Sequence, residues 1–261
     1  SLTFVWFFLP ALALIYYLAP GRKIKNAVLL IASLLFYSWG EPRYVALVLL
    51  SILFNYLFGL AIGKAGGRKG LRRAALAVCV GANLCLLGYF KYFNFFLELA
   101  YTVLGKEGFT PRNIALPIGI SFYTFQSMGY LIDVYRGKYA PDHNLFRFAL
   151  FVSFFPQILQ GPIGRYDRLA SQLFSQRKFS LERVERGLQL MLWGYFKKIV
   201  IADRAAVVVN EVFGNYEAYT GIAVIMGVLC YSIQLYGDFS GGMDVVMGAA
   251  ECFGISLDQN F

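Results

Sequence analysis

The chain has 261 residues, of which 58% are hydrophobic and 18% aromatic, while only 15% are charged. Soluble domains hold about 45–50% apolar and about 25% charged residues. The composition excludes a disordered chain, and it argues against a single soluble domain because so much apolar surface cannot be buried in a chain of this length. The formal net charge is +9. Because the Lys and Arg residues lie between apolar stretches, this charge indicates membrane topology and not nucleic-acid binding.

Apolar stretches that suit membrane crossing recur along the chain, since a transmembrane helix needs about 20 mostly apolar residues. The uncharged stretches are 2–19, 26–40, 44–63, 74–90, 113–132, 148–164 and 218–237, and two more with internal charge are 187–210 and 239–256. Residues 2–19 have no basic segment before them and are followed by further spans, so a signal peptide is not indicated. No repeat or low-complexity linker divides the chain. Residues 1–261 are therefore predicted to form one all-α integral membrane domain.

Basic residues in the short loops predict the orientation of the first spans. Arg22, Lys23 and Lys25 follow the first span, and five Lys and Arg residues in 64–73 follow the third, whereas the turn at 41–43 is neutral. Lys and Arg concentrate in cytoplasmic loops. We therefore expect the N-terminus and residues 41–43 outside the membrane, and both basic loops in the cytoplasm.

The stretch 148–164 has basic residues on both sides, which a simple crossing does not accommodate. It also contains Pro156, Gly161, Pro162 and Gly164, all of which disfavour a continuous helix. We predict a re-entrant element that enters the membrane and returns to the cytoplasmic side, because irregular backbone is tolerated at that depth only inside protein or along a water-filled cavity. The alternative is an ordinary Pro-kinked helix that departs from the charge rule.

Polar residues within the apolar stretch 113–132 have two interpretations. Gln126 and Tyr123, with Ser121 and Thr124, follow a break at 117–119. They are predicted either to line a tunnel or to join packed helices by hydrogen bonds. Asp133, at the end of this run, is expected either to pair with Arg136 at the membrane edge or to belong to a site.

The next predicted helix begins at Ser180, which can cap it, with Glu182 and Arg186 four residues apart as an ion pair. Lys197, Lys198, Asp203 and Arg204 lie farther along the same helix. Such charges must avoid lipid, so we expect them at an interface or facing the protein interior, and we favour lysines that extend toward the membrane surface.

The stretch 234–244 is the most suggestive part of the sequence. It places Asp238, Ser240, Asp244 and three glycines between two apolar runs. The two carboxylates would lie on different faces of a continuous helix. The glycines instead predict a break that directs polar groups at a cavity. A two-carboxylate metal site is not favoured, because no histidine lies nearby.

Cysteine and histidine give little support for catalysis or metal binding. Cys79, Cys85, Cys230 and Cys252 form no metal-binding spacing and are expected to be buried structural thiols. His143 is the single histidine and falls in a polar, turn-like loop. It is expected to be a solvated loop residue on the cytoplasmic side and not a catalytic base.

Taken together, these stretches resemble the membrane-bound O-acyltransferase family, with the membrane subunit of bacterial alginate O-acetylation as the nearest likeness. The matching residues are 88–94, 116–126, 130–136, 154–156 with 161–162, 196–198 with 202–203, and 235–236 with 238–241. The resemblance covers nearly the whole chain in order.

The resemblance implies a multi-span helical bundle with re-entrant elements in the bacterial inner membrane, surrounded by membrane lipids. It also implies acyl transfer, with acetyl-CoA or another cytoplasmic acyl thioester as donor substrate, no bound cofactor, and a periplasmic or extracellular acetyltransferase as partner. The candidate tunnel residues are Gln126, Tyr123, Asp238, Ser240, Asp244, Gly161, Pro162 and Arg165.

The chain departs from the family pattern at two places. The family carries its catalytic histidine shortly after an Asn-Phe step, and this chain ends at that step, Asn260-Phe261. We therefore expect the histidine after Phe261, the chain to be the N-terminal part of a longer protein, and the fragment to be inactive alone. Gly237 and Gly242 stand where relatives often have aromatic residues.

Two alternatives to O-acetylation remain. A D-alanyl transfer protein of teichoic acid modification belongs to the same family but takes its acyl group from a carrier protein. A transporter or channel also needs broken helices and polar groups at membrane depth, although the internal repeats typical of that class are absent from the sequence.

Overall fold

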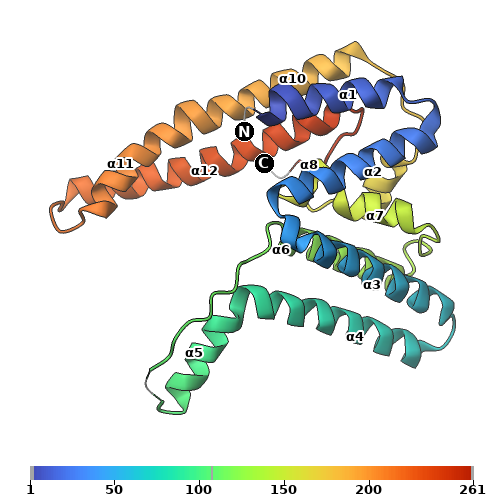
Figure 1. Ribbon diagram of the computed structural model, residues 1–261. Coiled ribbons are helices and arrows are strands. Elements are labelled where there is room, and N and C mark those ends of the chain that lie inside the picture. The colour runs from blue at the N-terminus through green and yellow to red at the C-terminus, as the bar shows by residue number, and fades with distance from the viewer. Residues whose placement is uncertain (1–2, 107, 260–261) are drawn as a thin grey trace. The chain divides into compact units, whose positions relative to one another are not determined.

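The computed structural model describes residues 3–106 and 108–259, and every regular element in these ranges is helical (Figure 1). Three continuous helical segments are long and apolar enough to cross a membrane: Pro42–Lys64, Lys69–Val103 and Ile222–Glu251. The predicted fold class, an all-α membrane protein, is confirmed. The step Asn260-Phe261, on which the family comparison in the sequence ended, lies outside the described residues.

The helices group into two compact units, each of which is described by itself. One unit holds the N-terminal segment through Leu18, the short stretch Gln160–Pro162 and the segment from Ser175 onward. The other holds Ala19–Leu159 and Ile163–Phe174. We call them the terminal unit and the central unit. The expectation of one membrane domain over 1–261 stays a prediction.

The central unit is built around α3. Its helices are α2 (Gly21–Gly40), α3 (Val45–Lys64), α4 (Lys69–Leu87), α5 (Phe93–Val103), α6 (Ile120–Arg136), α7 (Leu145–Ser153), α8 (Phe155–Ile158) and α9 (Tyr166–Leu173), with a 3-10 turn at Pro42–Tyr44 and a π-helical turn at Gly88–Tyr92. Helix α3 packs against α4, α6 and α7. Its Gly59 permits close contact, since a Cβ there would lie 2.9 Å from the Tyr130 ring on α6.

The expected span 113–132 begins too early. Residues 113–119 are irregular, and α6 begins only at Ile120. Gly119 explains the boundary, because its φ is +77° and a Cβ at this position would lie 2.1 Å from the Ile158 carbonyl oxygen. Only glycine fits this left-handed, crowded position. The helix that carries Tyr123 and Gln126 therefore starts against α8.

The stretch 148–164 is broken, as predicted. Helix α7 ends at Ser153, Phe154 has a non-helical ψ of 115°, and α8 has only four residues before irregular backbone resumes. At 1.5 Å per residue the nine residues of α7 reach about 13 Å, well short of the roughly 30 Å of a bilayer core. The alternative of one Pro-kinked spanning helix is wrong. That both ends face the cytoplasm stays a prediction.

The terminal unit contains two long antiparallel helical rods and, from the N-terminal part of the chain, α1 (Leu9–Leu18). One rod runs through α10 (Leu181–Phe196), the π-helical segment η4 (Lys197–Ala202) and α11 (Asp203–Gly214). The other is α12 (Ile222–Glu251), which lies alongside α10 and α11 (Figure 1). Ser180 caps α10 by accepting a hydrogen bond from the Arg183 amide, and Arg186 pairs with Glu182 at 2.9 Å, both as predicted.

The predicted helix break at 237–242 is wrong, because α12 is continuous through all three glycines. The glycines allow the two rods to approach closely. A Cβ on Gly194 would lie 2.5 Å from the Gly241 carbonyl oxygen, and one on Gly187 would lie 2.6 Å from that of Gly248. Small residues at such spacings let helix backbones pack together in membranes. Glycine serves helix packing here.

Candidate functional site

A cavity of about 670 Å³ in the central unit lies between α6 and the irregular segment before α9. It brings together two of the predicted tunnel residues, Gln126 from α6 and Arg165 at the start of α9. The lining residues are Gln126, Gly129, Tyr130, Ile132, Asp133, Arg136, Lys138, Ile163, Gly164, Arg165 and Tyr166. This is the best-formed site that contains residues predicted from the sequence.

Gln126 closes the deep end of the cavity. Its side chain is buried, and its amide donates to the Phe151 carbonyl oxygen at 2.9 Å and to Gln157 Oε1 at 3.4 Å. Gln157 in turn packs on Gly164, where a Cβ would lie 2.7 Å from its amide nitrogen. These amides fix the broken segment against α6, so Gln126 both joins helices and lines the cavity.

Helix α6 also carries hydroxyl groups that face the interior of the unit. The hydroxyl oxygens of Tyr123, Thr124 and Ser127 are buried and have no hydrogen-bond partner among the described residues. Buried polar groups are nearly always satisfied by protein, water or a ligand. The three hydroxyls therefore mark α6 as a polar face within an apolar protein, and the prediction that Tyr123 lines a tunnel stays a prediction.

The mouth of the cavity is cationic. Lys138 pairs with Asp167 at 2.7 Å and with Asp133 at 3.5 Å, so the expected pairing of Asp133 with Arg136 is wrong. Lys138 lies beyond the end of α6 and can reach both carboxylates, and its hydrogen bond lowers the pKa of the Asp167 carboxyl. Arg136 and Arg165 form no ion pair among the described residues, which leaves two cations at the entrance.

A second polar cluster, centred on Asp142, supports the cavity wall and was missed in the sequence. Tyr166 donates a hydrogen bond to the Asp142 carboxylate, and Arg147 pairs with the same group at 3.3 Å. The Asp142 amide donates to the Tyr130 hydroxyl at 2.9 Å. Residues from α6, α7 and α9 thus meet at Asp142, Tyr130 through the backbone amide and Arg147 and Tyr166 through the carboxylate. The only local signal was the turn-like 141–144 sequence.

In the terminal unit, the charged residues of η4 pair with those of α12. Lys197 contacts Asp244 at 2.6 Å, and Lys198 contacts Asp238 at 2.8 Å and Asp203 at 3.0 Å. The Lys197 and Asp244 side chains are 15% and 11% exposed, so extension of Lys197 to the membrane surface is wrong. A lysine within an apolar segment is stabilised by a carboxylate partner. This pairing brings Lys197 to the predicted stretch 234–244.

The remaining predicted residues are divided between the two units. Asp244 and Ser240 are buried on one side of α12, and the Ser240 hydroxyl has no described partner, while Asp238 is exposed on another face. Gly161 and Pro162 are buried in the terminal unit, where the neighbouring Gln160 amide packs on Gly242. Gln126 belongs to the central unit. That Gln126, Asp238 and Ser240 line one tunnel with the 161–162 break stays a prediction.

Among the described residues, the side chains of His143 and the cysteines take no part in these clusters. His143 is exposed in a loop, as predicted, and its carbonyl oxygen accepts a hydrogen bond from the Tyr56 hydroxyl at 2.8 Å. Cys79 and Cys252 are buried, but Cys85 is exposed, so the expectation of four buried thiols is wrong. Cys85 sits on the outer face of α4 beside the exposed Leu84. In a membrane, lipid covers such a face.

The fold and the cavity define a helical membrane protein whose central unit holds a cavity with a buried polar end and a cationic mouth. The chain is 40% identical over 264 aligned residues to the probable alginate O-acetylase AlgI of Pseudomonas aeruginosa, covering 100% of this chain and 50% of that protein. It is 33% identical to the peptidoglycan O-acetyltransferase of Helicobacter pylori, covering 99% and 54%. The teichoic acid D-alanyltransferase of Bacillus subtilis is 26% identical over 58% of this chain and 39% of its own length.

These similarities confirm the resemblance seen in the sequence, and the chain belongs to the membrane-bound O-acyltransferase family. No family model matches the chain, so the assignment comes from these relatives. The chain spans about half the length of the alginate O-acetylases that it matches.

Proposed function

We propose that the protein to which this chain belongs passes an acyl group, acetyl by the names of its relatives, from a cytoplasmic thioester toward O-acetylation of a polysaccharide. The observation that carries this proposal is the 40% identity, along the whole chain, to proteins named alginate O-acetylase. Identity to the teichoic acid D-alanyltransferase is lower and covers 58% of the chain, which favours acetyl over D-alanyl transfer.

The reaction needs a base and a site for a developing negative charge. The acceptor oxygen bonds to the thioester carbonyl carbon, the C–S bond breaks, and the acceptor proton passes through a general base to the departing thiolate. The family resemblance assigns the base to a histidine outside residues 1–261, and the exposed position of His143 supports this. A buried hydroxyl such as that of Tyr123 is suited to steady an oxyanion.

We assign the donor to the cavity between α6 and the segment before α9, which we call the α6 cavity. Acetyl-CoA carries several phosphates, and Arg136 and Arg165 offer two cations at the cavity mouth without carboxylate partners among the described residues. Gln126 and the hydroxyls of α6 provide polar groups farther in. The donor would enter from the cytoplasm, with the protein in the bacterial inner membrane and its N-terminus outside.

The product side requires a second protein in this proposal. An acetylated acceptor would form at the outer face of the membrane, and a periplasmic or extracellular acetyltransferase would move the group to the polysaccharide. Names of the relatives support a role in alginate modification. A transporter or channel is less well supported, since the three relatives described above are all named for acyl transfer.

Radiolabelled acetyl-CoA supplied to the cytoplasmic face of membrane vesicles tests the proposal, with the protein made at the length of its relatives. We expect donor-dependent loss of label from CoA. Arg165→Gln should raise KM for acetyl-CoA on the order of tenfold with kcat little changed, because it removes a charge that binds the donor. Arg43→Gln is the matched control, since Arg43 is exposed in the turn at 41–43, predicted to lie outside.

His143→Ala separates the two assignments of the base. We expect the variant at full relative length to keep its activity, and the 1–261 chain to have none. Loss of activity in a folded His143→Ala protein would make His143 catalytic. Vesicles that release no label at all would contradict the enzyme proposal and favour transport.

A further inference from the structure

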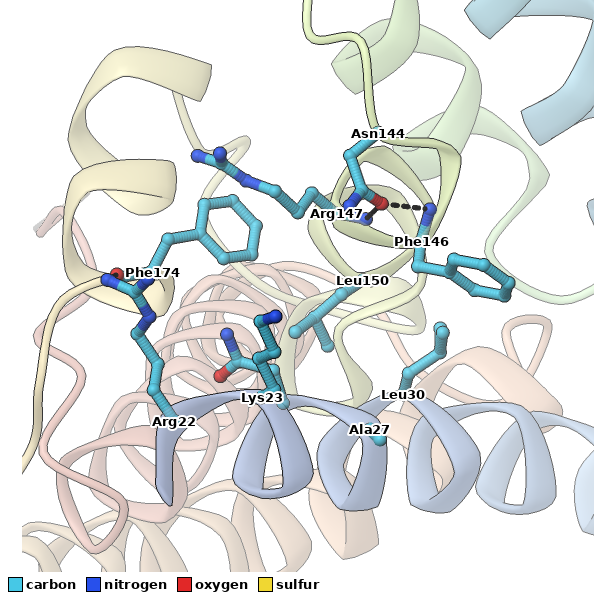
Figure 2. A pocket seen from close by; sticks show the side chains of 10 residues that line it. Arg22, Lys23, Ala27, Leu30, Asn144, Phe146, Arg147, Leu150 and Phe174 are labelled. Atoms are coloured by element: carbon cyan, nitrogen blue, oxygen red, sulfur yellow. Dashed lines mark hydrogen bonds between the residues drawn. The ribbon is translucent and has the colours of Figure 1, made fainter.

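A second cavity of the central unit, of about 650 Å³, lies between α2, α7 and the end of α9 (Figure 2). It shares no lining residue with the α6 cavity. Its residues are Arg22, Lys23, Asn26, Ala27, Leu30, Asn144, Phe146, Arg147, Leu150 and Phe174. Half of them are polar or cationic and half are apolar, so we call it the basic pocket.

The cations of the basic pocket are available for an anion. Among the described residues Arg22 and Lys23 form no ion pair with a carboxylate; Arg22 donates to the Phe174 carbonyl oxygen at 2.9 Å, which holds it at the rim. Arg147 pairs with Asp142 at 3.3 Å and lies 4.2 Å from the Phe174 ring centre. The pocket therefore has three cations, of which only Arg147 is neutralised by a carboxylate, so it keeps an excess of positive charge.

The polar and apolar residues are ordered along the helices. Arg22 and Lys23 stand in the first turn of α2, and Ala27 and Leu30 follow one and two turns deeper. On α7, Asn144 and Arg147 come at the start and Leu150 a turn later. Both helices begin at the pocket, and their N-terminal dipoles also favour an anion. Phe146, 73% exposed, extends the apolar side outward.

We propose that the basic pocket binds an anionic membrane phospholipid, with its phosphate between Arg22, Lys23 and Arg147 and its acyl chain along Leu30, Phe146 and Leu150. The gradient from cations to apolar residues matches the gradient from headgroup to chain in a lipid leaflet. Basic pockets between helices at the cytoplasmic side suit such headgroups. A soluble phosphate compound such as CoA shares the phosphate chemistry but has no use for the exposed Phe146 face.

The test uses the whole protein in nanodiscs that contain a photoactivatable phosphatidylglycerol in a phosphatidylcholine background. We expect crosslinking to α2 or α7, reduced on the order of fivefold for each cation removed in Lys23→Gln and in the double variant Arg22→Gln with Lys23→Gln. The matched control is Lys64→Gln with Arg68→Gln, which removes the same charge at the end of α3 and in the following turn, outside the pocket. Thermal unfolding in detergent checks that each variant is folded.

Three results would overturn the proposal. An equal loss of crosslinking in the control pair means general surface attraction, and an unchanged yield in the folded Lys23→Gln variant means no headgroup site. Displacement of the lipid from α2 and α7 by millimolar CoA, with crosslinking elsewhere on the protein unaffected, assigns the pocket to a soluble phosphate ligand. Acetyl transfer need not be measured, so failure here is distinct from failure of the proposed acyl transfer.

Discussion

At the scale of single residues, one pair of buried amide side chains joins two apolar helices. Asn55 on α3 and Asn83 on α4 exchange amide hydrogen bonds at 3.3 and 2.9 Å, and both are buried. Each also donates to a carbonyl oxygen one turn earlier in its own helix. Such interhelical amide pairs are worth about 0.6–2 kcal/mol in membranes.

Asn83→Ala should therefore lower the free energy of unfolding by about 1–2 kcal/mol, because it leaves the Asn55 amide buried with one partner fewer. Thermal unfolding in detergent, followed by the reactivity of the buried Cys79 thiol, measures the loss. Asn94→Ala is the control, since Asn94 makes only exposed hydrogen bonds to the Arg112 backbone. Equal loss in the two variants would contradict the role of the buried pair.

The carboxylates of the terminal unit give a second prediction. Asp244→Asn should cost about 2–4 kcal/mol of stability, since it strands the half-buried Lys197 without its counter-charge. Asp203→Asn removes an exposed carboxylate that shares Lys198 with Asp238, and it should cost less than about 1 kcal/mol. Denaturant unfolding of both variants in detergent gives the comparison. A loss of acyl transfer in Asp244→Asn with normal stability would instead assign Asp244 to the reaction.

At the scale of elements, the association of α12 with the α10–α11 rod depends on glycine. Gly194 and Gly241 lie face to face, and Gly187 and Gly248 repeat the arrangement two turns away. The backbones approach until carbonyl oxygens occupy the space of a missing Cβ. The same rods carry the Lys197–Asp244 pair, so close packing also sets the ion-pair geometry.

Gly194→Ala should destabilise the terminal unit by about 1–3 kcal/mol, because the new Cβ would meet the Gly241 carbonyl oxygen at 2.5 Å. Gly81→Ala on α4 is the matched substitution with open space around it, and higher helix propensity should make it neutral or stabilising by up to about 1 kcal/mol. Thermal unfolding of the two variants distinguishes them. A neutral Gly194→Ala protein would show that the rods can move apart without cost.

At the scale of the whole molecule, the orientation in the membrane decides which side the donor reaches. The basic loops predict that residues 22–25 and 64–73 are cytoplasmic and that 41–43 lie outside. The broken 148–164 stretch predicts that both of its flanks share the cytoplasmic side. The first expectation comes from the distribution of Lys and Arg, and the second from the broken backbone as well. One labelling experiment tests both.

Single cysteines placed at Pro42 and Arg68 should label from opposite sides, and cysteines at His143 and Gln176 from the same side as Arg68. All four positions lie in loops or turns, and all four are exposed. A membrane-impermeant maleimide applied to intact cells and to inside-out vesicles makes the measurement, in a background without Cys85 and Cys230. Labelling of Pro42 and Arg68 from one side would refute the orientation. Labelling of His143 and Gln176 from opposite sides would refute the re-entrant element.

The sequence by itself determined the all-α membrane class, the broken 148–164 stretch, the cap at Ser180, the loop position of His143 and the family. Each of these depends on signals that act within a few residues, such as hydropathy, proline and glycine placement, or a capping hydroxyl, and the family likeness adds up many short matches. Gln126, which lines the α6 cavity, was also singled out in this way, because polar residues are conspicuous in an apolar run.

The tertiary structure alone decided how the residues pair. Glycines such as 237 and 241 can bend a chain or let two helices touch, and only the presence of α10 and η4 beside α12 selects the second outcome. Lys197 meets Asp244, and Lys138 meets Asp167, because packing brings their segments together. The basic pocket joins α2 to α7, some 120 residues apart. Sequence spacing encodes neighbours along one helix, whereas partners across helices depend on which faces pack.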